Sequence, residues 1–221
     1  MKITIEARPA KGESVTIRFV LQDQRGKLPK PLPEEEFSGK ANSLLHLRHE
    51  KVLYVGLGER AKLDANRLRT AAGTATMALK AIGRTRIAAD LEAWPQYAAA
   101  ALEGMILADY RYEEFKEKKS PALEQIHLQV LGEDLAHVKL ACHRGSIVAE
   151  ATNFGRSIGN RPGNLLYPEE LANVAAAMAR EKGLKATIFD ERKLRDGKFG
   201  GLLAVGAGSS RGPRLIVLEH R

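Results

Sequence analysis

Residues 51–58 read KVLYVGLG, an apolar run that ends in a glycine turn. A short, nearly continuous apolar run of this kind predicts a buried strand, and its two glycines predict a turn directly after it. Asp64 is then placed to cap a helix, and Gly83 to end it. The apolar residues between them recur at helical spacing: Leu68, Ala72, Ala75, Leu79 and Ile82. A buried strand followed at once by a helix is typical of an α/β fold.

The sequence on either side continues this alternation of strands and helices. Further strands are expected at residues 1–7, 15–21, 86–91 and 124–131, and an alanine-rich helix at residues 94–109. The polar stretch 22–50 contains Pro29, Pro31 and Pro33, and predicts a long loop with a short strand near residues 44–48.

A long helix followed by a cluster of helix breakers divides the chain. Asp134 is placed to cap a helix that runs to about Ile158, and the cluster NRPGN at residues 160–164 cannot continue it. Pro168 suits the first turn of the next helix. Beyond that helix we expect a strand at 185–189, a short helix at 191–196, a strand end at 202–205 and a last strand at 214–219. The breaker cluster is therefore the predicted domain boundary.

Composition narrows the class of protein. The chain has 221 residues, of which 44% are hydrophobic and 28% charged, so it can bury a core and is not a disordered chain. No run approaches the roughly 18 apolar residues of a membrane span. The single cysteine, Cys142, excludes an intrachain disulfide and is expected to be a small core residue. A cytoplasmic protein without membrane contact is expected.

The net charge of +8 raises the alternative of a nucleic-acid partner. Much of the excess lies in residues 180–221, which hold ten Lys and Arg against five Asp and Glu. Aromatic residues make up only 5% of the chain and do not alternate with basic ones, which favours an ordinary solvated surface.

Local motifs do not identify a catalytic site. GSSRG at residues 208–212 has the letters of a nucleophile elbow, but an apolar strand-like run follows it where the elbow needs a helix. His46 and His49 have no third metal ligand near them in the sequence. Gly56 and Gly58 could approach a phosphate or nucleotide, although a strand-to-helix turn needs such glycines in any case.

Three motifs follow one another in the second half of the chain. The first is NFGRSIGNRPGN at residues 153–164, followed by the Pro168 helix with its Leu-Ala pair. The second is GGLLAVGAGSS at residues 200–210, and the third is the strand PRLIVL at residues 213–218. Together they resemble the leucyl aminopeptidase (cytosol aminopeptidase) family, which typically reads Arg-x-Leu-x-Asn-x-Pro-x-Asn at the first motif. Three motifs in this order and at this separation are more specific than any one of them alone.

The resemblance implies a fold and an assembly. Residues 1–133 would be an N-terminal α/β domain with a mixed sheet, similar to a macro domain, and residues 134–164 a connector helix and junction. Residues 165–221 would be the opening α/β elements of a catalytic domain. The family is cytosolic, forms homo-hexamers, and uses two divalent ions (zinc, manganese or magnesium) to release N-terminal amino acids, often leucine, from peptides.

The resemblance carries no catalytic or metal-binding residue onto this chain. The family's ligand loops follow the strand that ends near Glu219, so residues 1–221 are expected to be inactive alone and to have an architectural, oligomerising role, with no cofactor of their own. Five junction residues are expected to be structural: Arg156, Asn160, Pro162, Asn164 and Pro168. Arg156 and Arg161 could bind phosphate, but an ion pair between domains or subunits is the expected role of both. An ADP-ribose or nucleotide site at the glycine turn stays as the alternative suggested by the macro-like domain.

Overall fold

A computed structural model describes residues 1–10, 12–27, 36–132 and 134–220, which form two compact units. Unit 1 is Met1–Arg156 and unit 2 is Ser157–Arg221. The division lies within the segment 134–164 that the sequence marks as connector and junction. The prolines expected in the loop at 22–50 lie outside the described residues.

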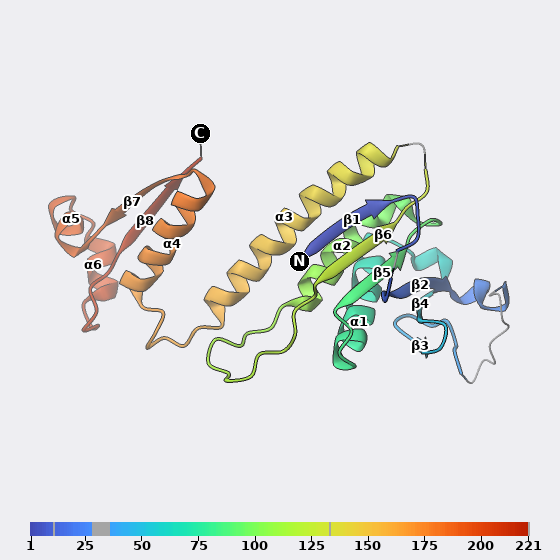
Figure 1. The fold of residues 1–221 in the computed structure, drawn as a ribbon. Helices are drawn as coiled ribbons and strands as arrows, with labels where there is room; N and C mark the ends of the chain where they lie inside the picture. The colour runs from blue at the N-terminus through green and yellow to red at the C-terminus, as the bar shows by residue number, and fades with distance from the viewer. Residues whose placement is uncertain (11, 28–35, 133, 221) are drawn as a thin grey trace. The chain divides into compact units, whose positions relative to one another are not determined.

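Unit 1 is built on a six-stranded mixed sheet in the order β1-β6-β5-β2-β4-β3 (Figure 1). The strands are β1 (Lys2–Glu6), β2 (Val15–Leu21), β3 (Leu44–Leu47), β4 (Val52–Gly58), β5 (Arg86–Asp90) and β6 (Gln125–Gln129). Every neighbouring pair is parallel except β3 and β4, which run antiparallel. The predicted α/β fold with a mixed sheet is confirmed, and the apolar run at residues 51–58 forms β4, buried along its whole length.

The connections between these strands are η1 (Gln22–Lys27), η2 (Arg60–Lys62), α1 (Ala65–Ala81), η3 (Pro95–Tyr97) and α2 (Ala98–Asp109). Helices α1 and α2 form where the sequence predicts them, whereas the short 3-10 turns η1 and η2 were not predicted. Asp64 caps α1, because its Oδ1 accepts a hydrogen bond from the amide of Arg67 at 2.7 Å. Gly83 ends the helix in the left-handed region at φ +75°.

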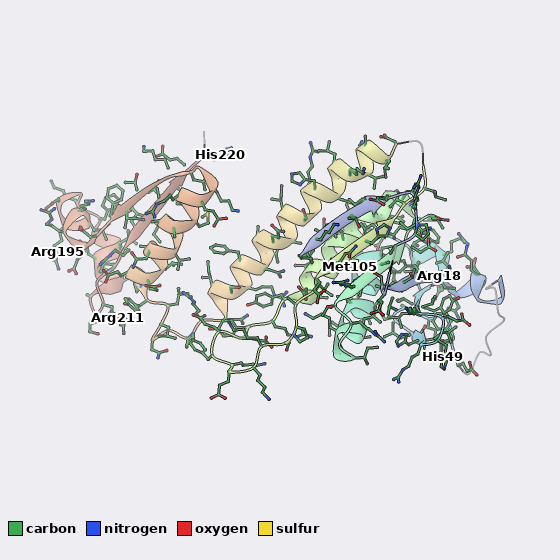
Figure 2. All side chains as sticks on the ribbon, viewed as in Figure 1. Arg18, His49, Met105, Arg195, Arg211 and His220 are labelled. Atoms are coloured by element: carbon green, nitrogen blue, oxygen red, sulfur yellow. The ribbon has the colours of Figure 1, made fainter. Side chains whose placement is uncertain are left out.

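The main core lies between one face of the sheet and helices α1 and α2. Alternate residues of the strands meet Leu68 and Leu79 of α1 and Met105 of α2, all of which are almost completely buried. Met105 is labelled in Figure 2. On the other face Phe37 packs against β2 and β4 beside Tyr54, with the two ring centroids 6.2 Å apart. The sheet is therefore covered by helices on one side and partly by the loop before β3 on the other.

Helix α3 (Leu135–Gly159) packs along α2 by a narrow face of small residues. Asp134 caps it, accepting from the amide of His137 at 2.9 Å. Its buried residues are Cys142, Gly145 and Ala149. Gly145 lies against the carbonyl of Ala99, so a side chain there would meet the α2 backbone.

Unit 2 contains a two-stranded antiparallel sheet with three helices. Its elements are α4 (Pro168–Lys182), β7 (Lys185–Phe189), α5 (Glu191–Asp196), α6 (Gly200–Gly206) and β8 (Leu215–Glu219). The strand end expected at residues 202–205 is wrong, because these residues belong to α6. A four-residue apolar run cannot by itself distinguish a strand from a helical turn, and here the amide of Leu203 donates to the carbonyl of Phe199.

Unit 2 buries little of its apolar surface. Among its described residues only Ala172, Ala179 and Leu194 are buried. Seven large apolar side chains are exposed: Leu165, Leu171, Phe199, Leu202, Val205, Val217 and Leu218. Across the described parts of both units, no helix is long and apolar enough to cross a membrane.

Candidate functional site

The glycine turn after β4 is filled by the chain's own backbone. The amide of Gly58 donates to the carbonyl of Gly39 at 2.9 Å, and the amide of Gly56 donates to the carbonyl of Ser43 at 2.9 Å. A Cβ on Gly56 would overlap the Lys40 carbonyl oxygen and lie 2.7 Å from the carbonyl carbon of Gly39. The close approach of residues 39–43 is therefore what requires a glycine at position 56.

This arrangement gives the amides of Gly56 and Gly58 acceptors from the chain itself. An anion site at a strand-to-helix turn uses backbone amides that point outward to the ligand. Here both glycine amides already have carbonyl acceptors, and a guanidinium nitrogen of Arg67 lies 3.5 Å from the carbonyl oxygen of Leu57. Close packing against residues 39–43 accounts for both glycines, and the nucleotide site at this turn stays a prediction.

Arg156, at the end of unit 1, holds the end of α3 to the end of α2. Its Nη1 donates to the carbonyl of Leu107 at 2.9 Å and to Oδ1 of Asn153 at 3.1 Å, and its guanidinium lies 4.2 Å from the centroid of the Tyr110 ring. Nδ2 of Asn153 donates to the carbonyl of Ile106 at 3.1 Å. Both side chains satisfy carbonyls in the last turn of α2. Arg156 thus has a carbonyl and a ring as partners within its own unit, and the ion pair between domains or subunits stays a prediction.

The remaining junction residues shape the turn into α4. The amides of Leu165 and Leu166 both donate to the carbonyl of Pro162 at 2.9 Å, and Pro168 stands in the first turn of α4. Asn160 and Asn164 are exposed. Tyr167 occupies the cap position without a side-chain cap bond, and its ring lies 3.7 Å from the guanidinium carbon of Arg211.

Cys142 and the GSSRG segment at residues 208–212 could carry catalytic chemistry, but neither lies in surroundings that would activate it. Burial, with a smaller contribution from Glu103, raises the pKa of the Cys142 thiol to about 11, so it stays protonated near neutral pH. GSSRG follows helix α6 and precedes β8, so the strand and helix of a nucleophile elbow are both missing around it.

Sequence reasoning did not single out His127 of β6, which is buried. Its Nδ1 lies 2.8 Å from Oγ1 of Thr4, and its Nε2 lies 2.8 Å from the carbonyl oxygen of Arg8. Because a carbonyl only accepts, Nε2 carries a proton and donates to Arg8. The ring thereby ties β1 and the segment after it to β6. Only its place in an alternating strand could have signalled this role.

The side chains present do not fit a dinuclear metal centre. Within the described residues there is no group of three or more His, Cys, Asp or Glu side chains that could hold a metal ion. His46 of β3 has a pKa lowered by burial and by the charges of Arg48 and Arg84, a surrounding that disfavours any further positive charge.

Comparisons with known proteins point to one family for both units. Residues 8–119 match the model of the cytosol aminopeptidase family N-terminal domain, and residues 153–221 match the model of that family's catalytic domain. The whole chain is 35% identical to 48% of a probable cytosol aminopeptidase of Solibacter usitatus. A second relative, a probable cytosol aminopeptidase of Desulfovibrio desulfuricans, is 38% identical over 84% of this chain and 40% of its own length.

Solved structures share the fold. A mutant of tomato leucine aminopeptidase superposes with a TM-score of 0.84 at 19% identity, covering 99% of this chain and 50% of its own. The bottromycin maturation enzyme BotP superposes with a TM-score of 0.78 at 24% identity, covering 94% of this chain and 46% of its own. A further structure of that enzyme is a complex with Mn.

The chain spans about half the length of the curated relatives it matches. The N-terminal domain model alone covers half of the chain, and the catalytic-domain model begins within the last turns of α3. The two structural units therefore follow each other along the chain in the same order as the two domain models. The chain belongs to the cytosol aminopeptidase family and carries its N-terminal domain and part of its catalytic domain.

Proposed function

We propose that this chain is the N-terminal portion of a leucyl aminopeptidase-type dinuclear metallopeptidase, which releases N-terminal amino acids, often leucine, from peptides. The family membership supports this proposal. In it, residues 1–133 form the macro-like domain, residues 134–164 the connector and junction, and residues 165–221 the opening of the catalytic domain.

The observation that carries the proposal is the small core of unit 2. Among its described residues, unit 2 leaves seven large apolar side chains exposed and buries only three small or medium ones. Exposed apolar side chains in this number indicate a surface that further polypeptide covers. This supports an architectural role for residues 157–221, in which they frame a catalytic centre rather than form one.

The same proposal assigns the chemistry to groups outside these residues. Two divalent ions, zinc, manganese or magnesium, would activate a water against the peptide carbonyl. Because the described side chains do not fit such a centre, no step of that reaction is assigned to them. A cytoplasmic location and a homo-hexamer of the complete enzyme belong to the proposal as well.

An aminopeptidase assay tests the proposal that residues 1–221 are inactive alone. The purified 221-residue chain should release no p-nitroaniline from leucine p-nitroanilide with added Mn²⁺, Zn²⁺ or Mg²⁺, because its described residues contain no cluster of side chains that could hold a metal ion. A leucine aminopeptidase assayed alongside confirms that the conditions support activity. Chelator-sensitive release that co-elutes with the chain on size exclusion would overturn the proposal that these residues are inactive alone.

Hydrogen exchange tests the proposed incompleteness of unit 2. Amides of β7 and β8 should exchange on the order of 100-fold faster than those of β2 and β5, because local opening is cheapest where few apolar groups are buried. Mass spectrometry of peptic fragments separates the two units. Equal protection of both sheets in a monomeric sample would contradict this expectation.

A further inference from the structure

A pocket opens in unit 1 on the face of the sheet that α1 and α2 do not cover, where β2 and β5 lie side by side. Along β2, Ile17 and Phe19 belong to the core under these helices, so Arg18 between them lies on the opposite face. The pocket has a volume of about 230 Å³, which is room for about eight water molecules at their liquid volume. Its lining includes Arg18, Val20, Tyr54, Asp90, Glu92 and Trp94.

The strand order favours a ligand site at this place. β2 and β5 are parallel neighbours, but the other parallel neighbour of β2 is β4, whereas that of β5 is β6. The chain goes on from β2 to β4 and from β5 to β6, so the connections after the two strands lead to opposite sides of the sheet. In open α/β sheets, small molecules bind in the crevice at the carboxyl ends of two such strands. The pocket lies at this crevice, since β5 ends at Asp90.

Three side chains in one row across the sheet supply polar groups to the pocket. Arg18, labelled in Figure 2, is in register with Asp90 of β5 on one side and with Tyr54 of β4 on the other. Nε of Arg18 lies 3.6 Å from Oδ2 of Asp90, which is too long for a hydrogen bond. Within the described residues neither the Arg18 guanidinium nor the hydroxyl of Tyr54, a residue only 4% exposed, makes a hydrogen bond. Buried polar groups in proteins are usually hydrogen-bonded, so these two indicate a polar ligand.

The charges in the pocket select the class of ligand. The Arg18 side chain is 42% exposed, and a guanidinium binds a carboxylate through two parallel N–H bonds. Asp90 and Glu92 outnumber this cation, which disfavours a multiply charged anion such as phosphate and favours an ammonium group beside the carboxylate. The indole of Trp94 and the side chain of Val20 add an apolar wall. A carboxylate, an ammonium and an apolar group within so small a volume describe a free α-amino acid.

We propose that this pocket binds a free α-amino acid with an apolar side chain. Arg18 holds the carboxylate, Asp90 and Glu92 hold the ammonium, and the side chain lies against Trp94. Binding by unit 1 needs no peptide cleavage, so its failure and the failure of the proposed function are separate results. Free amino acids are also what the proposed function releases, and only the consequence that the pocket binds a product rests on that function.

Equilibrium dialysis of the full chain against radiolabelled leucine tests the proposal. A ligand of this size should bind with a Kd on the order of 100 μM to 1 mM. Trp94 is the single tryptophan and lines the pocket, so the same titration should change its fluorescence. Isocaproate lacks the ammonium of leucine and isopentylamine lacks its carboxylate. Both, and inorganic phosphate, should bind at least about tenfold more weakly, because each leaves a charged group of the pocket without its partner.

Matched variants locate the site. Arg18→Gln should weaken leucine binding at least about tenfold, and the isosteric Tyr54→Phe should weaken it about threefold. Arg86→Gln is the control, because Arg86 lies on β5 outside the pocket and pairs with Glu124. Circular dichroism confirms that each variant is folded. The proposal is overturned by a folded wild-type chain that binds no leucine at about 10 mM, tenfold above the weakest expected Kd. Phosphate or isocaproate binding as tightly as leucine, or Arg18→Gln binding leucine as tightly as Arg86→Gln, would overturn it as well.

Discussion

Replacing Gly104 with alanine should lower the free energy of unfolding of unit 1 by about 3 kcal/mol. Gly104 lies in α2 where that helix crosses α1, and a Cβ there would stand 2.9 Å from the carbonyl carbon of Arg69 and closer still to its oxygen. The obstacle is backbone, so no side-chain rotation relieves it. The two helices would have to separate, and the core that Leu68 and Met105 share would open with them.

Urea denaturation followed by tryptophan fluorescence measures this effect. Trp94 is the single tryptophan and is 9% exposed within unit 1, so its emission reports that unit's unfolding. Gly155→Ala is the matched control, since a Cβ at that helical position meets nothing within 4 Å. It should leave stability unchanged or raise it by up to about 1 kcal/mol through helix propensity. Equal midpoints for the two variants would contradict the close-crossing argument.

Replacing Lys80 with methionine should destabilise unit 1 by about 3 kcal/mol, because it leaves a partly buried carboxylate without its cation. The Lys80 side chain is 5% exposed and that of Asp109 is 19% exposed, and the two form an ion pair between the ends of α1 and α2. Lys80 Nζ also donates to the carbonyl of Asp109 at 2.9 Å, and Asp109 accepts from the amide of Leu123 at 3.1 Å. The pair thus fastens both helices to the segment that leads into β6.

Lys62→Met provides the comparison for this pair. Lys62 and Glu59 form an ion pair at 2.9 Å in which both side chains are 61% exposed, so its loss should change the stability far less than the loss of Lys80. Thermal and urea unfolding of the two variants, at low and high salt, separate the effects, because salt screens the exposed pair far more than the buried one. A Lys80→Met variant as stable as Lys62→Met would show that Asp109 is satisfied by its backbone partner alone.

Elements with a strong local signal could be predicted from the sequence. The apolar run of β4, the caps Asp64 and Asp134, the stop at Gly83 and the start at Pro168 each depend on neighbouring residues, and the structure has each of them. The family could be identified in the same way, because its motifs at the junction and at α6 are short segments whose order survives in the sequence. The α/β class follows from the alternation of such elements.

Features that depend on distant residues could be decided only by the tertiary structure. Residues 202–205 form a helix in place of the expected strand end. Four apolar residues suit a strand or a helix equally well, so the surrounding structure decides between the two. The amides of the glycine turn are occupied because residues 39–43 reach them from another part of the chain. Arg156 contacts the carbonyl of Leu107 in α2 and the ring of Tyr110 directly after α2, nearly fifty residues away in sequence, and no local pattern specifies such partners. The sequence by itself determined the local elements and the family, whereas packing between elements decided which polar groups are satisfied and which faces stay open.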